Sequence, residues 1–408
     1  MSLPRVAHVL RKYDADELGG TEKHVEEMVA RLPGLGFACE VHAPRGPREK
    51  PGLQITRYAA HCPFLGAAER RQALRRNAGN LISFEEPLRL GLDKQLALAH
   101  LHTAGRIGGG VRTAMRLTRR PYLISVHGPL LSGGAFLAED TARRLEGLVD
   151  VGQPLGFVLG ARRVLDDATR VLCFNDEEYK GLQARVGARA VRMDHGVDVQ
   201  KLSSGNGAAA RGKLGLGDKP VVLQVGRLCA QKDQLLAVRA FAAGAPRDAV
   251  LVLAGAETDR GYRIAVESEA RALGVSARVL LLGNVPAAEV PDLLAAATIC
   301  LAPSVHEAFG LVALEAWAAN KPMLFSRNGG LADLARALGA SAPVVDSREP
   351  ALWAAAIKAL LGDAELRARA AAEGAQLVAR RFSWDLAAAR LAALYREVLD
   401  EGARGRAA

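Results

Sequence analysis

The chain lacks the cysteine spacing of a disulfide framework or a zinc knuckle. Its 408 residues contain five cysteines, and they stand far apart, at positions 39, 62, 173, 229 and 300. An odd number of widely spaced cysteines is typical of a protein from a reducing compartment. The sequence also has no HExxH motif and no close run of His and Cys residues. We therefore expect no bound metal.

Long apolar runs are also missing. No stretch approaches eighteen apolar residues, and the first residues, MSLPRVAHVL, lack the charged and apolar regions of a signal peptide. We expect a cytoplasmic protein that could still touch the inner face of a membrane from one side.

Two common nucleotide-binding motifs are absent as well. The only Gly-Lys pair, Gly212-Lys213, is followed by Leu rather than Ser or Thr, and no apolar strand runs into G-x-G-x-x-G. These absences argue against a P-loop kinase and against an ordinary dinucleotide-dependent dehydrogenase.

Short apolar, β-branched runs alternate with segments of helical period along the whole chain. This alternation predicts parallel sheets covered by helices on both faces. The expected strands of the first half are Arg5–Leu10, Cys39–Ala43, Leu98–His102, Tyr122–His127, Arg170–Phe174 and Val191–Met193. The expected helices there are Thr21–Leu32, Gly109–Leu117, Gly156–Ala168 and Asp176–Val186.

The rhythm breaks over residues 201–220, a Gly/Ser/Lys-rich stretch that we interpret as a linker, and then restarts. The expected strands of the second half are Val221–Val225, Val250–Ala254, Val279–Leu282, Ile299–Pro303, Met323–Ser326 and Pro343–Val345. The pattern predicts two Rossmann-like, doubly wound α/β domains facing a central cleft, over residues 1–202 and 203–383. Ser383 is a candidate N-cap for a last helix from Trp384, and residues 384–402 are expected to join the first domain.

The most informative motif is Ser304-Val-His-Glu-Ala-Phe-Gly-Leu-Val-Ala-Leu-Glu315. A strand ends, a loop carries Glu307 and Gly310, and a helix begins whose first N–H groups, at Leu311 and Val312, would suit a phosphate. Glu315, one turn further, could accept hydrogen bonds from ribose hydroxyls. Two glutamates eight residues apart are, on the other hand, often ordinary surface charges.

A second motif follows the first strand of the second half. Arg227 leaves that strand and Lys232 stands at the start of the next helix. Two cations at one edge of a sheet suit a diphosphate, since Arg offers a fork of donors and Lys a point charge. The alternative is a solvated pair in a loop.

The first half offers weaker signals. Gly19 and Gly20, with Thr21 as a candidate N-cap, precede a helix and would let a ligand approach the backbone. His127 ends a strand, where it could hydrogen-bond a sugar hydroxyl or simply cap the strand.

Together these segments resemble the family-4 retaining glycosyltransferases of the GT-B fold, the glycosyl transferases group 1. The resemblance spans nearly the whole chain, in family order: Gly19-Gly20, Ser125-Val-His-Gly128, Asp194-His-Gly-Val-Asp198, Gly226-Arg-Leu-x-x-x-Lys232, and Glu307-x7-Glu315 with its Phe-Gly. The chain departs from the family where it has Asp194-His195 instead of the frequent Pro-Asn, and Asp333 where a Glu is common. These departures leave the sugar harder to name.

The resemblance implies a hexosyltransferase that uses a UDP- or GDP-linked sugar and serves bacterial polysaccharide, glycolipid or glycoconjugate synthesis. It implies that Arg227 and Lys232 neutralise the leaving diphosphate, and that Glu307 and His127 contact the donor sugar. The other implied donor contacts are the backbone at Gly19, Gly20, Gly310, Leu311 and Val312 for the phosphates, Glu315 for ribose, and Asn284 and Val285 for the base. The acceptor would be a sugar, a lipid-linked molecule or another compound with a free hydroxyl. No further cofactor is expected.

Alternatives remain open at this point: another GT-B enzyme, such as a sugar-nucleotide epimerase or an α-glucan synthase or phosphorylase, or a basic nucleic-acid-binding protein. The net charge of +10 suggests the last, but no nucleic-acid-binding motif accompanies it, and we expect no nucleic-acid partner. Residues 45–120 hold fifteen basic and five acidic side chains, including Arg70, Arg71, Arg75 and Arg76. This segment is either a solvated surface or a site of peripheral membrane contact.

Overall fold

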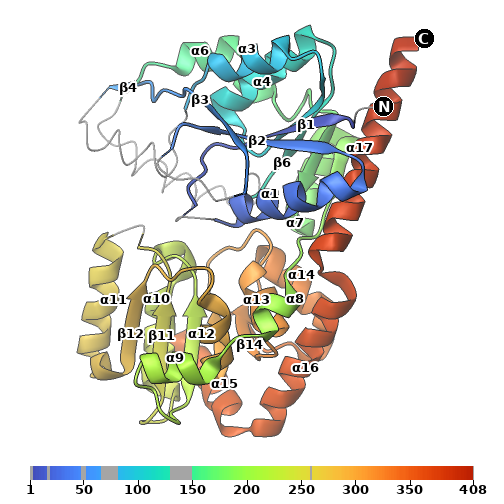
Figure 1. Ribbon diagram of the computed structural model, residues 1–408. Coiled ribbons are helices and arrows are strands. Elements are labelled where there is room, and N and C mark those ends of the chain that lie inside the picture. Colours follow the sequence, from blue (N-terminus) through green and yellow to red (C-terminus); the bar gives the residue numbers. More distant parts are fainter. Residues whose placement is uncertain are drawn as a thin grey trace. The chain divides into compact units, whose positions relative to one another are not determined.

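The computed structural model describes residues 3–15, 19–46, 52–65, 81–128, 149–257 and 260–407. Its contacts divide the chain into two compact units. Unit 1 contains Met1–Asp194 together with Ala387–Ala408, and unit 2 contains His195–Leu386. Each unit is a sheet with helices packed on it (Figure 1). The predicted boundary at residue 202 falls within α8 (Val199–Ser203) of unit 2.

Unit 1 is built on a seven-stranded parallel sheet in the order β3-β2-β1-β5-β6-β8-β9. Its strands are β1 (Arg5–Val9), β2 (Ala38–Pro44), β3 (Ile55–Tyr58), β5 (Leu96–Leu101), β6 (Tyr122–Ser125), β8 (Arg170–Cys173) and β9 (Ala190–Arg192). Two short strands, β4 (Phe64–Leu65) and β7 (Val149–Asp150), pair antiparallel beside it. The chain runs outward from β1 to β3 and then returns to continue from β5 on the other side. The strand order therefore reverses between β1 and β5, where doubly wound folds bind ligands.

Among the described residues of unit 1, the helices are α1 (Gly20–Arg31), α3 (Glu85–Leu92), α4 (Gly105–Leu117), α6 (Gln153–Val158), α7 (Asp176–Val186) and part of α17 (Trp384–Ala407). The predicted helix over residues 156–168 is wrong, because α6 ends at Val158 and Gly160 adopts a left-handed conformation before a short 3-10 turn, Ala161–Arg163. The glycines of α4 explain how this turn packs so closely. A Cβ on Gly109 would lie 2.9 Å from the Cα of Ala161.

Unit 2 is built on a six-stranded parallel sheet in the order β12-β11-β10-β13-β14-β15. Its strands are β10 (Val221–Val225), β11 (Val250–Ala254), β12 (Val279–Gly283), β13 (Ile299–Ala302), β14 (Met323–Ser326) and β15 (Val344–Val345). Its helices are α8, α9 (Gly207–Lys213), α10 (Gln234–Gly244), α11 (Arg260–Ala272), α12 (Val290–Ala296), α13 (Leu311–Ala318), α14 (Gly329–Leu338), α15 (Pro350–Gly362) and α16 (Ala364–Arg381). Here the order reverses between β10 and β13.

The predicted linker over residues 201–220 is a packed part of unit 2. It holds the end of α8 and all of α9, which lies against α12. Two of its glycines serve close packing, since a Cβ on Gly205 would lie 2.1 Å from the carbonyl oxygen of Pro291 and one on Gly207 2.8 Å from that of Ala295. The sequence pattern was misleading because glycine marks close approach as well as flexibility.

The last helix, α17, begins as predicted. The hydroxyl of Ser383 accepts a hydrogen bond of 3.1 Å from the Leu386 backbone N–H, which confirms the N-cap. From Ala387 onward the helix belongs to unit 1. Tyr395 is fully buried against that sheet, and Arg170 on β8 forms an ion pair with Glu397. Across the part of the chain that the structure describes, no helix is both long and apolar enough to cross a membrane.

Candidate active site

The point where the strand order of unit 2 reverses carries two neighbouring loops. The first follows β10 and holds Gly226, Arg227 and the short 3-10 turn Ala230–Lys232. The second follows β13 and holds Glu307 before α13 begins. Because β10 and β13 are parallel neighbours, both loops leave the same edge of the sheet.

Lys232 and Glu307 meet between these loops. The Lys232 ammonium forms an ion pair with Oε1 of Glu307, and the Ser304 hydroxyl donates a hydrogen bond of 2.9 Å to the same oxygen. The Lys232 side chain is 17% exposed and that of Glu307 10% exposed. The pair is therefore partly withdrawn from water. The attraction between the two charges is stronger there than it would be on an open surface.

One side chain that the sequence did not single out fastens the two loops together, and a second fixes Glu307 within its own loop. The Gln231 side chain donates to the His306 carbonyl at 3.0 Å, and the Val305 N–H donates to the Gln231 carbonyl at 2.8 Å. Ser304, the other, holds Glu307. Their position just after paired strands was the only signal in the sequence. They fix Lys232 and Glu307 in a set geometry.

The start of α13 lies directly beyond Glu307. Gly310 is its N-cap, with a positive φ of 96° that an L side chain rarely adopts. Leu311 and Val312 form the first turn, where backbone N–H groups have no intrahelical acceptor. The Gly330 N–H at the start of α14 donates to the Glu307 carbonyl at 2.8 Å. The arrangement offers an anion site next to a fixed carboxylate.

Arg227 and Glu315 flank this centre. The Arg227 residue is exposed, and its guanidinium donates to the Gln231 side chain at 3.3 Å. Glu315 lies half-buried in the second turn of α13. Arg227, Lys232, Glu307 and the α13 start thus belong to one edge of the unit 2 sheet, as the sequence predicts for loops at the carboxyl ends of strands.

Asn284 and Val285 lie elsewhere in unit 2. They line a cavity of about 340 Å³ between the end of β12, α9 and α12, together with residues such as Lys213 and Glu289. None of Arg227, Lys232, Glu307 or Glu315 lines this cavity. The volume falls within the range of small-molecule pockets.

Gly19 and Gly20 of unit 1 begin α1 after the strand β1. Gly19 is the N-cap, so the expectation of Thr21 as N-cap is wrong. Glycine has no side chain that could cap the helix, but the Glu22 carboxylate reaches back and accepts a 3.0 Å hydrogen bond from the Gly19 backbone N–H. A Cβ on Gly19 would lie 2.7 Å from that carboxylate, so another residue here would displace the end of the flexible Glu22 side chain.

His127 stands two residues after β6 and is partly exposed. Its ring stacks on Phe174 at 4.8 Å between centroids and lies 5.3 Å from the ring of His24 on α1. The two site segments of unit 1 are thus neighbours, since α1 begins at Gly20. Burial lowers the pKa of His127 to about 3, so the imidazole is neutral at physiological pH.

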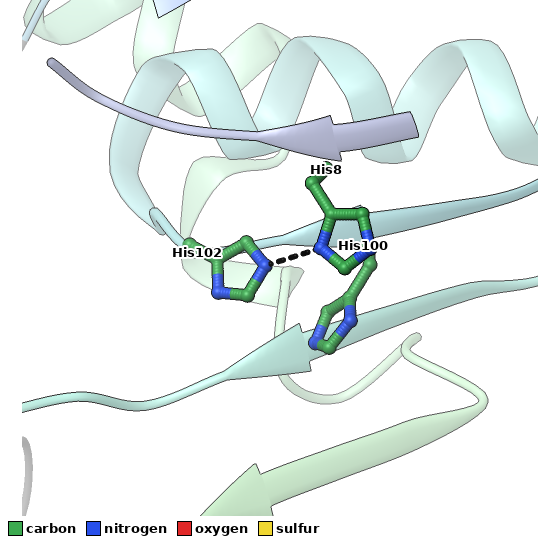
Figure 2. A group of neighbouring side chains, drawn as sticks. All are labelled: His8, His100 and His102. Carbon is green, nitrogen blue, oxygen red and sulfur yellow. Dashed lines mark hydrogen bonds between the residues drawn. The ribbon is translucent and has the colours of Figure 1, made fainter. Parts of the chain in front are cut away.

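Three further histidines gather at the switch point of this sheet. His8 from β1 and His100 from β5 lie beside His102, which follows β5 (Figure 2). All three are buried, and nitrogen atoms of their rings lie within 4.8 Å of one another. The sequence showed no close histidine group because the fold brings together residues more than ninety positions apart. Burial lowers the pKa of His8 to about 3 and those of His100 and His102 well below the usual value.

The basic residues Arg70, Arg71, Arg75 and Arg76 lie outside the described residues. The prediction of membrane contact through residues 45–120 therefore stays a prediction.

Comparison with solved structures defines the class. HepE from Anabaena, solved with UDP and glucose, matches with a TM-score of 0.74 at 17% identity over 95% of this chain and 98% of that one. WaaG, a glycosyltransferase involved in lipopolysaccharide biosynthesis, matches with a TM-score of 0.68 at 17% identity over 96% of this chain and 99% of that one. Together with the two parallel sheets, these likenesses confirm the GT-B fold.

Sequence comparison gives the family. Residues 208–377 match the model described as "Glycosyl transferases group 1", and residues 19–194 match the "Glycosyl transferase 4-like domain". A D-inositol 3-phosphate glycosyltransferase of Nocardia farcinica is 31% identical over 94% of this chain and 81% of its own length. One of Kineococcus radiotolerans is 30% identical over 96% of this chain and 93% of its own length. The chain belongs to the glycosyl transferases group 1 family, and it is a hexosyltransferase that takes a sugar from a nucleotide sugar.

Proposed function

We propose that this protein moves a hexose from a UDP- or GDP-linked sugar to an acceptor hydroxyl, with retention of the α configuration. The observation that carries the proposal is the Lys232–Glu307 ion pair beside the first turn of α13. At one edge of the sheet it brings together the Lys232 ammonium, the Glu307 carboxylate, which can accept hydrogen bonds from hydroxyls, and the backbone N–H groups at the start of α13. A sugar diphosphate presents the complementary groups: anionic oxygens next to a ring of hydroxyls.

The leaving diphosphate is the charge that must be stabilised. As the bond between the sugar C1 and the phosphate oxygen breaks, negative charge develops on that oxygen. In our proposal Arg227 and Lys232 lie against it, and the N–H groups of Leu311 and Val312 add the positive end of α13. Fixed donors of this kind are worth about 100-fold to 1,000-fold in turnover each.

The new glycosidic bond forms on the same face of the sugar. The acceptor oxygen bonds to C1 as the phosphate leaves, and the acceptor proton passes to a leaving phosphate oxygen. This step needs no protein nucleophile and balances without any other reactant. We assign Glu307 and His127 to hydroxyls of the donor sugar, which they would hold while the bond exchange occurs.

The other donor contacts are proposed on the same grounds. Glu315 accepts hydrogen bonds from ribose, Gly310 lets the phosphates approach the helix end, and Asn284 and Val285 border the base. In unit 1 the backbone at Gly19 and Gly20 contacts the phosphates. The Gly19 N–H already donates to Glu22, so this contact requires Glu22 to give way or the Gly20 N–H to take over.

The acceptor is proposed from the relatives. The proteins at 30–31% identity that span nearly all of this chain are named D-inositol 3-phosphate glycosyltransferases. We therefore propose a phosphorylated cyclitol as the first acceptor to test, with lipid-linked and free sugars as the next. A cytoplasmic enzyme that touches a membrane through residues 45–120 is part of the same proposal.

The test begins with the donor. Purified protein is screened by thermal shift with UDP, GDP and ADP and their hexose conjugates, and the donor that stabilises it most is incubated with D-inositol 3-phosphate. We expect one nucleotide to raise the melting temperature and its sugar to be transferred. Epimerised donor without transfer, or stabilisation by none of the nucleotides, would contradict the proposal.

A further inference from the structure

A chain of hydrogen-bonding side chains runs through unit 1 and reaches His127. The contacts are His127 Nε2 to His102 Nδ1 at 2.8 Å, His102 Nε2 to His8 Nδ1 at 3.0 Å, His8 Nε2 to the Tyr395 hydroxyl at 3.4 Å, that hydroxyl to His100 Nδ1 at 2.5 Å, and His100 Nε2 to the Ser125 hydroxyl at 2.8 Å. The contact between His102 and His8 is the dashed line in Figure 2. Only His127 is partly exposed, so the chain leads from the buried core to the site.

The protons in this chain are not independent. A neutral imidazole carries one N–H and one lone pair, and burial keeps these rings neutral by lowering their pKa values. Each ring that donates on one side must accept on the other. All the hydrogen bonds therefore run in one direction, and the proton position on His127 depends on groups far inside the unit.

Tyr395 sets that direction. Its hydroxyl has one proton and two neighbours, His100 Nδ1 at 2.5 Å and His8 Nε2 at 3.4 Å. A phenol O–H donates more strongly than an imidazole N–H, so the short contact takes the tyrosine proton. Burial raises the pKa of Tyr395 well above its usual value, which keeps that proton on the oxygen.

The remaining assignments follow step by step. His8 donates from Nε2 to Tyr395, so its Nδ1 accepts from Nε2–H of His102. Nδ1 of His102 in turn accepts from Nε2–H of His127. This leaves His127 as the Nε2–H tautomer, with a lone pair on Nδ1.

We propose that His102, His8 and Tyr395 are positioning residues that hold His127 as the Nε2–H tautomer, with the lone pair on Nδ1. That this lone pair accepts from a hydroxyl of the donor sugar, in place of any partner that His127 has in the free protein, rests on the proposed function. The tautomer itself does not.

A bound metal is the competing use of this cluster. The rings of His8, His100 and His102 are close enough to share an ion. All six of their ring nitrogens, however, already have a hydrogen-bond partner. An ion would have to take lone pairs that these hydrogen bonds use.

The test measures the tautomer directly. In protein labelled with ¹⁵N-histidine, the imidazole nitrogen shifts distinguish a protonated from an unprotonated nitrogen, and His127→Gln assigns the signals of His127. We expect a protonated Nε2 and an unprotonated Nδ1 in the wild type. The reverse pattern, or a stoichiometric transition metal in the purified protein, would overturn the proposal.

The variant Tyr395→Phe removes the hydroxyl and keeps the ring. His8 then faces an apolar edge at Nε2, where an unpaired lone pair costs less than an unpaired N–H. The hydrogen bonds between His8, His102 and His127 should then all reverse their donor–acceptor direction, and His127 should become the Nδ1–H tautomer. The matched control is Tyr122→Phe, which removes a buried hydroxyl that donates to the Val164 carbonyl at 2.7 Å outside the chain. It should leave the His127 signals unchanged.

Ser125→Ala is an independent variant, because it removes the acceptor at the buried end and should reverse the same chain. If both variants leave the His127 tautomer unchanged, the proposal is wrong. With a donor and an acceptor that the protein turns over, the KM for the donor should rise about fivefold in Tyr395→Phe, as for one lost hydrogen bond. It should not rise in Tyr122→Phe. A protein that transfers no sugar but shows the predicted tautomers would refute the proposed function alone.

Discussion

Replacing Lys232 by Met separates the two roles that its ammonium can have. The side chain forms an ion pair with Glu307, and in our proposal it also neutralises the leaving diphosphate. Met keeps most of the side chain's length and apolar surface but removes the charge. Any structural effect of the substitution should therefore come from the unpaired Glu307.

The two effects have different sizes. Breaking an exposed ion pair costs up to about 1 kcal/mol, and breaking a fully buried one about 3–5 kcal/mol. Lys232 is 17% and Glu307 10% exposed, and Ser304 still donates to the carboxylate. We expect a loss of about 2 kcal/mol in the free energy of unfolding. Turnover should fall about 100-fold to 1,000-fold, as for a lost transition-state donor.

A double-mutant cycle distinguishes the roles. Adding Glu307→Gln to Lys232→Met replaces the unpaired carboxylate by a neutral amide, so urea unfolding should recover most of the lost stability. Turnover, followed by nucleotide release, should stay far below that of Glu307→Gln alone, which keeps the Lys232 ammonium. The control is Arg239→Gln, which breaks the more exposed pair with Glu269 and should change turnover little. If the double variant turns over as fast as Glu307→Gln alone, Lys232 acts only through the fold and the leaving-group assignment is refuted.

Three further predictions concern single positions. Gly310→Ala should lower the free energy of urea unfolding by about 1–2 kcal/mol, because φ is +96° and the new Cβ would lie 2.6 Å from Leu331; Gly362→Ala, with open space around it, is the control, and equal stability of the two variants would contradict the strain. Burial alone would lower the pKa of His42, but hydrogen bonds to Glu40 and Glu86 raise it to about 9. The stabilisation is thus complete below the ordinary value of 6.5 and is lost as the pH rises through 9; unfolding measured from pH 7 to 10 should show a decline in the wild type that is absent in His42→Gln, and parallel curves would disprove it. Ser383→Ala should lower the melting temperature through the loss of about 1 kcal/mol of N-cap energy; the wild-type melting temperature in this variant would mean that the cap contributes nothing.

The strands of unit 2 could be predicted to within about two residues. Buried parallel strands appear as continuous apolar runs, and β10 and β11 are wholly or almost wholly buried. The strand β3 was missed because it lies at the sheet edge and its sequence, Ile-Thr-Arg-Tyr, is half polar. The other edge strands of the two parallel sheets, β9, β12 and β15, have more apolar sequences and were predicted. Local pattern therefore misses a strand when half of its residues are polar.

The candidate site was predicted only in part. The glycines and charges of each loop are visible in the sequence, because anion sites need backbone N–H groups and cations at strand ends. The contact between Lys232 and Glu307, 75 residues apart, depends on which strands become neighbours. The histidine chain depends on the same thing, since His100 and Tyr395 are separated by 295 positions. The roles of the site residues stay predictions.

The configuration of the product tests the central claim most directly. The donor that the protein prefers, carrying an α-linked hexose, is incubated with the acceptor, and the anomeric proton of the product is observed by NMR from the first turnovers. Same-face substitution at a site that stabilises the leaving diphosphate predicts an α-glycoside, with the small coupling of an equatorial anomeric proton. A β-glycoside of the same sugar would contradict the account.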